Sequence, residues 1–112
     1  MPDILTVFVT TANEEEAVRI AKILVTERLA ACANMVPGVR SIYRWKGEIW
    51  DTEERLLIIK TRATLFPALE KRIRALHSYE VPEIVAIPIV AGSAPYLEWV
   101  LECTQEQAGD SG

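Results

Sequence analysis

The sequence has few of the residues from which catalytic and metal centres are usually built. Its 112 residues include one histidine and two cysteines, and the cysteines, Cys32 and Cys103, do not form a CxxC pair. It contains no GxxxxGKS/T, GxGxxG, HExxH or GxSxG motif, the signatures of phosphate, dinucleotide, zinc-protease and serine-hydrolase sites. One histidine without a Ser/His/Asp constellation also argues against nucleophilic hydrolysis. We therefore expect a protein that is not an enzyme.

The chain also lacks a cluster of basic residues and a long apolar run. Lys and Arg number 12 against 16 Asp and Glu, which gives a net charge of -4, so neither nucleic acid nor an anionic membrane is an expected partner. The first residues have no basic region, and no stretch approaches the ~18 apolar residues of a membrane span. These absences predict a cytoplasmic protein whose thiols are reduced.

What the chain does have is enough apolar material for a core. Half of its residues, 50%, are hydrophobic. The length suits a single domain over residues 1–112, of which residues 107–112 are expected to fray. A domain of this size buries only about two-thirds of its unfolded surface, so association with other copies would add stability.

Apolar periodicity and turn residues divide the chain into alternating strands and helices. Asn13, Thr64 and Ser93 are expected to cap the three helices, and Glu16 completes a capping box with Asn13. The order is the βαββαβ pattern of an α+β, ferredoxin-like fold with antiparallel sheet order 4-1-3-2, followed by a C-terminal helix. The expected strands cover residues 4–11, 32–46, 48–61 and 84–90, and the expected helices cover residues 14–31, 64–77 and a segment after Ser93.

Composition predicts which strands are central. The unbroken apolar run LLII at residues 56–59 is typical of a central strand that is buried on both faces. Pro37 and Pro88 each remove a ladder donor, which places the second and fourth strands at the edges of the sheet. Free edges of two copies that meet head to tail can close a ring.

The second and third strands are too long for the helices that would cover them. Strands of about 15 residues extend about 50 Å, whereas a helix of about 14 residues extends about 21 Å, so the hairpin that turns at Lys46–Gly47 must overhang. Exposed aromatic side chains on such an arm would favour aggregation. We expect neighbouring subunits to cover the arm; a hairpin folded back over its own sheet is the alternative. The predicted interface residues are Tyr43, Trp45, Ile49 and Trp50.

The turn at residues 77–84, HSYEVPEI, holds the only histidine. His77 is either a metal ligand or a helix C-terminal residue that meets the negative end of the helix dipole. Both helices are expected to end at the same end of the sheet, which would bring Cys32 near His77, and a thiolate with an imidazole suits copper or zinc. Cys32 is alternatively a small core residue. Thr10 and Thr11 are expected at the opposite end, within reach of His77 only across a subunit interface.

Charged and aromatic residues offer further ligand candidates. Glu80 and Glu83 are candidate ligands for a hard divalent cation, or are solvated or paired with a neighbour's Lys or Arg. Lys60, at the end of a central strand, is a candidate for an anion or for an ion pair with Glu83. Tyr79 and Trp45 are candidates for the wall of a ligand cleft between subunits, and subunit packing is the alternative for Trp45.

Five stretches match one known family in order: ERLAACAN at residues 27–34, YRWKGEI at 43–49, IKT at 59–61, HSYEVPEI at 77–84 and YLEW at 96–99. With them the chain resembles the CutA family of divalent-cation tolerance proteins. The resemblance implies a cytosolic homotrimer of ferredoxin-like subunits, similar in architecture to the PII signalling proteins, with a link to copper and other divalent metals. Copper-binding relatives carry a cysteine at the end of the first strand and a doubled histidine, where this chain has Thr10–Thr11 and Leu76–His77.

Three functions follow from these observations. The first is a trimeric copper or divalent-metal tolerance protein without catalysis, whose candidate ligands are His77, Cys32, Glu80 and Glu83. The second is a PII-like sensor that binds a small molecule in the cleft between subunits, where Lys60, Tyr79 and Trp45 are the candidates. The third is a structural or adaptor trimer without a ligand.

Overall fold

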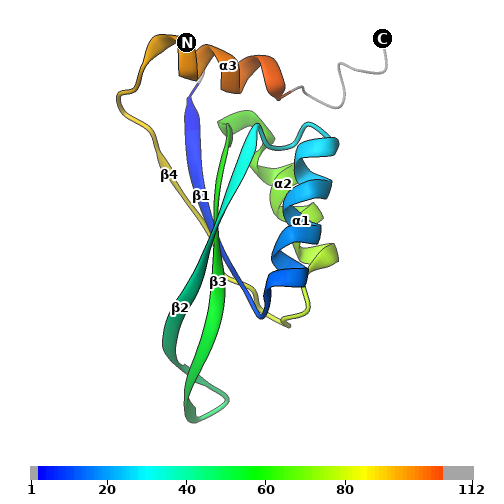
Figure 1. Ribbon diagram of the computed structural model, residues 1–112, viewed down its shortest axis with the longest axis vertical. Helices are drawn as coiled ribbons and strands as arrows, with labels where there is room; N and C mark the ends of the chain where they lie inside the picture. The colour runs from blue at the N-terminus through cyan, green and yellow to red at the C-terminus, as the bar shows by residue number, and fades with distance from the viewer. Residues whose placement is uncertain (1–2, 105–112) are drawn as a thin grey trace.

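The chain forms a four-stranded antiparallel sheet with two helices on one face and a third helix across one end (Figure 1). The elements are β1 (Ile4–Thr11), α1 (Glu14–Thr26), β2 (Cys32–Trp45), β3 (Glu48–Arg62), a 3₁₀ turn (Ala63–Leu65), α2 (Phe66–Leu76), β4 (Ile84–Pro88) and α3 (Ala94–Cys103). The sheet order β2-β3-β1-β4 confirms the predicted α+β, ferredoxin-like topology. This computed structural model describes residues 3–104, and the predicted fraying of residues 107–112 lies outside them.

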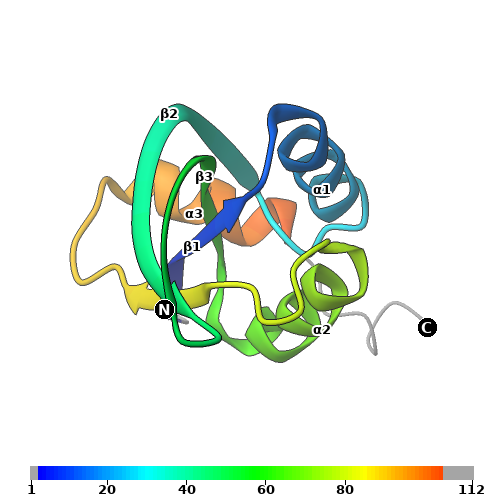
Figure 2. The ribbon, with the colours of Figure 1, turned by 90° about the horizontal axis from the view of Figure 1, so that it is seen from below.

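The core lies between the sheet and the helices α1 and α2, which cover the same face (Figure 2). Val7 and Val9 of β1 and Leu57 and Ile59 of β3 are fully buried, whereas the residues between them are only partly covered. This alternation is expected for strands with one face against a core. The helical side chains that are fully buried against the strands are Ala17, Ile20, Leu24, Leu69 and Ile73.

The helices α1 and α2 run in opposite directions, so the prediction that they end at the same end of the sheet is wrong. β1 and β3 are antiparallel, and each helix runs back along the strand that precedes it, which makes the two helices antiparallel as well (Figure 1). Cys32 follows α1 and pairs with Lys60 of β3. His77 follows α2 and contacts Thr10, which pairs with Leu56. Cys32 and His77 therefore lie toward opposite ends of the sheet.

Several element boundaries differ from the prediction. α1 ends at Thr26 rather than near residue 31, because Arg28 has a φ of 62° in the left-handed region, which a helix does not accommodate. Thr64 lies within the 3₁₀ turn and does not cap α2; Leu65 holds that position and makes no side-chain bond to the helix. Ser93 is at the N-cap of α3, as predicted, but without a side-chain hydrogen bond.

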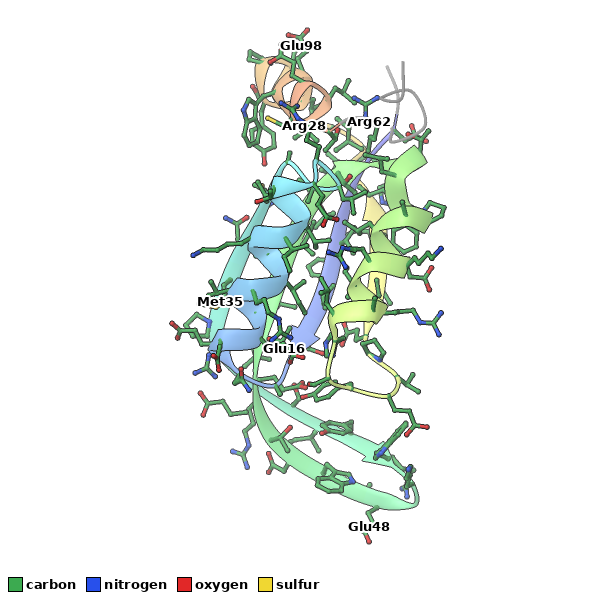
Figure 3. All side chains as sticks on the ribbon, turned by 90° about the vertical axis from the view of Figure 1, so that its right-hand side faces the viewer. Glu16, Arg28, Met35, Glu48, Arg62 and Glu98 are labelled. Atoms are coloured by element: carbon green, nitrogen blue, oxygen red, sulfur yellow. The ribbon has the colours of Figure 1, made fainter. Side chains whose placement is uncertain are left out.

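The β2-β3 hairpin extends beyond the rest of the sheet. β1 pairs with β3 only as far as Thr11 with Arg55, whereas the β2-β3 ladder continues to Trp45 with Glu48. Lys46 and Gly47 turn the chain with φ of 52° and 83°, as the two-residue hairpin turn requires. The molecule measures 47 × 31 × 23 Å, and Glu48 at the hairpin tip and Glu98 on α3 lie at its two ends (Figure 3). The predicted overhang is present.

The sheet face opposite α1 and α2 carries apolar side chains that are half-buried or exposed. Ile58, Phe8 and Val85 form a cross-strand row on this face, because Phe8 pairs with Ile58 of β3 and with Val85 of β4. Val85 is 50% exposed and Ile87, two residues along the same edge strand, is 54% exposed. We call the three paired residues the apolar row.

The terminal helix α3 packs across the end of the sheet at which β1 begins. Val100 is fully buried in a second cluster with Ile4 and Ala31. Cys103, the last residue of α3, is half-buried and packs against this cluster. Among the described residues, no helix has the length and apolar character that a transmembrane segment requires.

Candidate functional site

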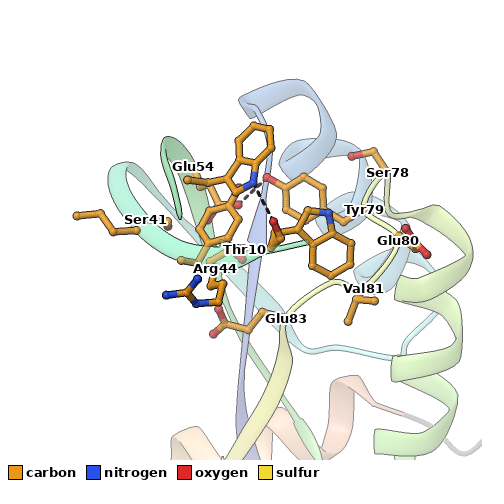
Figure 4. Close-up of a pocket in the computed structure, with 13 residues that line it drawn as sticks. Thr10, Ser41, Arg44, Glu54, Ser78, Tyr79, Glu80, Val81 and Glu83 are labelled. Atoms are coloured by element: carbon orange, nitrogen blue, oxygen red, sulfur yellow. Dashed lines mark hydrogen bonds between the residues drawn. The ribbon is translucent and has the colours of Figure 1, made fainter. Parts of the chain in front are cut away.

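The overhanging hairpin and the turn at residues 78–83 enclose a groove of about 730 Å³ (Figure 4). The groove brings together four residues predicted as ligand candidates. Glu80 and Glu83 were predicted as ligands of a divalent cation, and Trp45 and Tyr79 as the wall of a cleft for a small molecule. The complete lining is Thr10, Ser41, Ile42, Tyr43, Arg44, Trp45, Trp50, Glu54, Ser78, Tyr79, Glu80, Val81 and Glu83.

A hydrogen bond between Tyr79 and Glu54 joins the turn to the hairpin. The Tyr79 hydroxyl donates to Glu54 Oε2 at 2.5 Å, and Glu54 is only 4% exposed. Burial raises the pKa of Tyr79, and the hydrogen bond to Glu54 raises it further. The phenol therefore keeps its proton at neutral pH and acts as a donor that fixes the Glu54 carboxylate.

The groove's aromatic side chains are held by the hairpin itself. Trp50 Nε1–H donates to the backbone carbonyl of Trp45 at 3.3 Å, and Tyr43 pairs with Trp50 across the ladder. At the rim, Lys46 Nζ lies 5.6 Å from the centre of a Trp45 ring and 3.6 Å from Glu80 Oε1. Three predicted interface residues, Tyr43, Trp45 and Trp50, therefore line the groove, whereas Ile49 does not.

His77 lies behind the groove with its side chain fully buried. Its Nδ1 accepts the Tyr79 N–H at 3.0 Å, which assigns the proton to Nε2, and Nε2–H donates to the Thr10 carbonyl at 2.7 Å. The one in-plane lone pair of the neutral ring, on Nδ1, is engaged by the Tyr79 N–H, and Nε2 carries the proton, so within the chain the ring has no free lone pair for a metal ion. This contact is made within one chain, so the prediction that Thr10 reaches His77 only across a subunit interface is wrong.

Glu16 anchors the same turn from the start of α1 (Figure 3). Its carboxylate accepts the Ala12 N–H at 3.1 Å and the Ser78 N–H at 2.6 Å, and lies 3.8 Å from His77 Nδ1. Burial opposes ionisation, but hydrogen bonds from Ser78 and Ala12 outweigh it and lower the pKa of Glu16. The predicted Asn13 cap is confirmed, since its Oδ1 accepts the Glu16 N–H at 2.9 Å.

Cys32 and Lys60 lie outside the groove. They are paired across β2 and β3. Lys60 Nζ donates to Asn34 Oδ1 at 2.8 Å, so its partner within the chain is not Glu83. Cys32 Sγ lies 3.6 Å from the hydroxyl of Tyr96, and burial together with this contact raises the pKa of Tyr96 to about 12.

The candidate metal ligands do not form one centre within a chain. Over residues 3–104, no three His, Cys, Asp or Glu side chains come together in a way that could hold a metal ion. Cys32 is remote from His77, and Glu80 is paired with Lys46. A copper site built from His77 and Cys32 of the same chain is therefore not compatible with this geometry.

Sequence reasoning missed Glu54 and placed Thr10 at the opposite end of the sheet from His77, which it contacts. Glu54 ends the polar segment DTEE at residues 51–54, which predicts a solvated face, and only its contact with Tyr79 distinguishes it. Thr10 contributes through its backbone carbonyl, which accepts the hydrogen bond from His77. A backbone group is common to all residues, so the sequence gives no sign of this contact. Glu16 was identified as a helix cap, and its bond to Ser78 spans 62 positions of the chain.

Comparisons with known proteins agree on one family. A family model described as "CutA1 divalent ion tolerance protein" matches residues 5–103. The divalent-cation tolerance protein CutA of Thermus thermophilus is 55% identical over 98 residues, which are 88% of this chain and 95% of that protein. A chloroplastic CutA 1 of rice is 46% identical over 102 residues, or 91% of this chain and 58% of the rice protein.

Solved structures give the same result. The Thermus thermophilus protein superposes with a TM-score of 0.89 at 53% identity, covering 91% of this chain and 99% of that one. Rice CutA1 superposes with a TM-score of 0.91 at 44% identity, covering 95% of this chain and 97% of that one. A third structure, from Archaeoglobus fulgidus, has a TM-score of 0.87 at 38% identity, covers 94% of this chain and 100% of that one, and is described as periplasmic.

Proposed function

The chain belongs to the CutA1 divalent ion tolerance family, and from this membership we propose that it is a non-catalytic homotrimer of the cytoplasm that serves in tolerance to copper and other divalent cations. The observation that carries the assembly is the apolar row Ile58–Phe8–Val85 on the sheet face opposite α1 and α2, where Ile58 and Phe8 are half-buried and Val85 is 50% exposed. Burying an apolar side chain of this size stabilises a complex by about 1.5–3 kcal/mol.

Two further features support association of copies. Ile49 is 62% exposed, and Ile42, on the neighbouring strand, is 66% exposed; the hairpin that carries them overhangs the subunit. The strands β2 and β4 form the two edges of the sheet. Because an edge strand presents unpaired backbone groups, β2 of one copy and β4 of the next are complementary, and head-to-tail contacts of this kind close into rings.

In this proposal the cation binds between neighbouring copies of the chain. Cys32 is half-buried beside Lys60 on the same face as the apolar row, so a trimer places the thiol near a neighbouring chain. The carboxylates of Glu80 and Glu83 lie on an exposed turn and supply oxygen ligands from another copy. His77 has a positioning role, because both of its ring nitrogens are engaged within the chain.

Calorimetric titration of the metal-free protein with CuCl₂ and ZnCl₂ tests this function. Saturable heat is expected, weakened in Cys32→Ser and in Glu83→Gln. Cys103→Ser is the matched control, since Cys103 is the last residue of α3 and packs against the cluster of Ile4, Ala31 and Val100, and it should bind as the parent does. If the protein is trimeric but the heats equal those of dilution, metal binding is contradicted. The function that then stays is that of a structural or adaptor trimer.

A second candidate function is a PII-like sensor that binds a small molecule at the groove beside the subunit junction. The observation in its favour is the groove of about 730 Å³ between the hairpin and the turn at residues 78–83. A thermal-shift screen tests it, because a ligand that binds only the folded protein raises its melting temperature.

A further inference from the structure

We propose that the groove is a binding site for a protonated organic amine. The proposal rests on the second candidate function and assigns its ligand class. It follows from three properties of the groove and its rim. Two properties belong to the lining, which has aromatic walls and an excess of carboxylates (Figure 4). The third is the ammonium group of Lys46, which lies at the rim near Trp45 and Glu80.

The walls of the groove are aromatic. Tyr43, Trp45, Trp50 and Tyr79 all line it. The indole of Trp50 is fixed by its bond to the Trp45 carbonyl at 3.3 Å, and the phenol of Tyr79 by its bond to Glu54 at 2.5 Å. Aromatic faces attract alkylammonium groups through the ring quadrupole and cover their methylene segments. Rings held in place lose little freedom when such a ligand binds.

The charge of the lining selects for cations. Three carboxylates, Glu54, Glu80 and Glu83, face one guanidinium, that of Arg44, so the lining carries a net charge of -2 when these groups are ionised. An anionic metabolite or a nucleotide would be repelled. Within the described part of the chain no three such side chains are close enough to share one metal ion. Carboxylates spread along a groove instead suit a ligand with several separated ammonium groups.

The rim of the groove already holds an ammonium group in this manner. Lys46 Nζ lies 5.6 Å from the centre of a Trp45 ring and 3.6 Å from Glu80 Oε1. An exposed primary ammonium therefore lies between one ring and one carboxylate at this place. An incoming amine competes with Lys46 at Glu80, while its remaining charge reaches Glu83 and the buried carboxylate of Glu54, which is 4% exposed.

The groove and the apolar row belong to the same side of the sheet. Thr10 lines the groove and lies two residues after Phe8 on β1, so its side chain is on the same face as the row. A neighbouring copy packed on the row would border the groove. The amine site is therefore expected to be complete in the assembled protein, and binding is to be measured on the assembled form.

Titration with spermidine, followed by calorimetry at fixed ionic strength, tests the proposal. The parent protein should show saturable binding with one site per chain. Because hydrogen bonds and ion pairs to charged groups dominate the contact, Glu80→Gln/Glu83→Gln should weaken binding by about tenfold or more. Lys46→Ala should strengthen it several-fold, since it removes the competing ammonium. Glu98→Gln on α3, at the far end of the molecule (Figure 3), is the matched control and should bind as the parent does.

Three results would overturn the proposal: no spermidine heat above dilution, equal weakening in Glu98→Gln, or the same heat from MgCl₂ as from spermidine. The mass of the assembly, which shows whether the protein is a trimer, is measured for each variant in the same buffer. If the parent protein is a trimer but does not bind spermidine, the amine site is contradicted and the proposed homotrimer is not. If the parent protein is not a trimer, the proposed homotrimer is contradicted.

Discussion

The imidazole of His77 donates from Nε2 to the backbone carbonyl of Thr10 at 2.7 Å. This bond ties the end of β1 to the turn after α2, and the Tyr79 N–H bond to Nδ1 at 3.0 Å shapes the turn itself. Within the chain, His77 thus supports the groove from the C-cap position of α2, which is the second of the two roles that the sequence left open for it.

Replacement of His77 is expected to cost stability. His77→Ala removes two buried hydrogen bonds and leaves a cavity, so it should lower the free energy of unfolding by about 2–4 kcal/mol. His77→Gln keeps an N–H donor for the Thr10 carbonyl and should recover part of the loss. Thermal unfolding at fixed protein concentration measures both. A His77→Ala protein with unchanged stability and abolished copper binding would instead make His77 a ligand.

The Glu16 carboxylate predicts a dependence of stability on pH. Its pKa is lowered from the ordinary value of 4.5 in the folded protein, so its contribution is present above about pH 4.5 and is lost as the pH falls through the folded pKa. Glu16→Gln should cost about 1–2 kcal/mol at pH 7, and the difference from the parent should shrink as the pH falls below 4.5. A difference that is constant over this range would show that Glu16 does not act through its charge.

The hydrogen bond between Tyr79 and Glu54 is expected to contribute more to the stability of the fold than a similar hydrogen bond on the hairpin surface. Tyr79→Phe removes a donor from a carboxylate that is 4% exposed, with an expected loss of about 1–2 kcal/mol of stability. Tyr43→Phe is the control, because the Tyr43 hydroxyl accepts only a 3.4 Å bond from Thr52 at the surface. Urea unfolding measures both variants. If the two substitutions lower the free energy of unfolding equally, burial does not make the bond between Tyr79 and Glu54 more stabilising.

The helix α3 is predicted to depend on one arginine. Arg62 donates to the Leu101 and Thr104 carbonyls and to Thr104 Oγ1, where a cation also meets the negative end of the helix. Arg62→Met should therefore speed amide exchange over residues 97–104. Arg28→Met, which loses a single exposed bond to the Glu102 carbonyl, should change it little. Faster exchange in Arg28→Met than in Arg62→Met would contradict this assignment.

The fold was accessible from the sequence because it is encoded locally. The apolar run at residues 56–59 placed β3 at the centre, and Pro37 and Pro88 placed β2 and β4 at the edges. Gly38 and Gly47, both with positive φ, mark the bulge and the turn of the hairpin. Strand length alone predicted that the hairpin would extend beyond the helices.

The candidate site was less accessible, for two different reasons. The predicted meeting of Cys32 and His77 failed because helix direction was misjudged, although the antiparallel pairing of β1 and β3 fixes it. The bonds of Glu16 to Ser78 and of Tyr79 to Glu54 join residues 62 and 25 positions apart. Such pairs leave no periodic signal in the sequence, because each depends on a single side chain that reaches across the fold.

Sedimentation of the purified protein at low micromolar concentration tests the central claim most directly. The account predicts a single species of three times 12.6 kDa for the parent, and a smaller folded species when the apolar row is broken by Val85→Asp. A parent protein that sediments as a stable, folded 12.6 kDa monomer would show that the apolar row and the hairpin need no neighbouring chain, and would contradict the account.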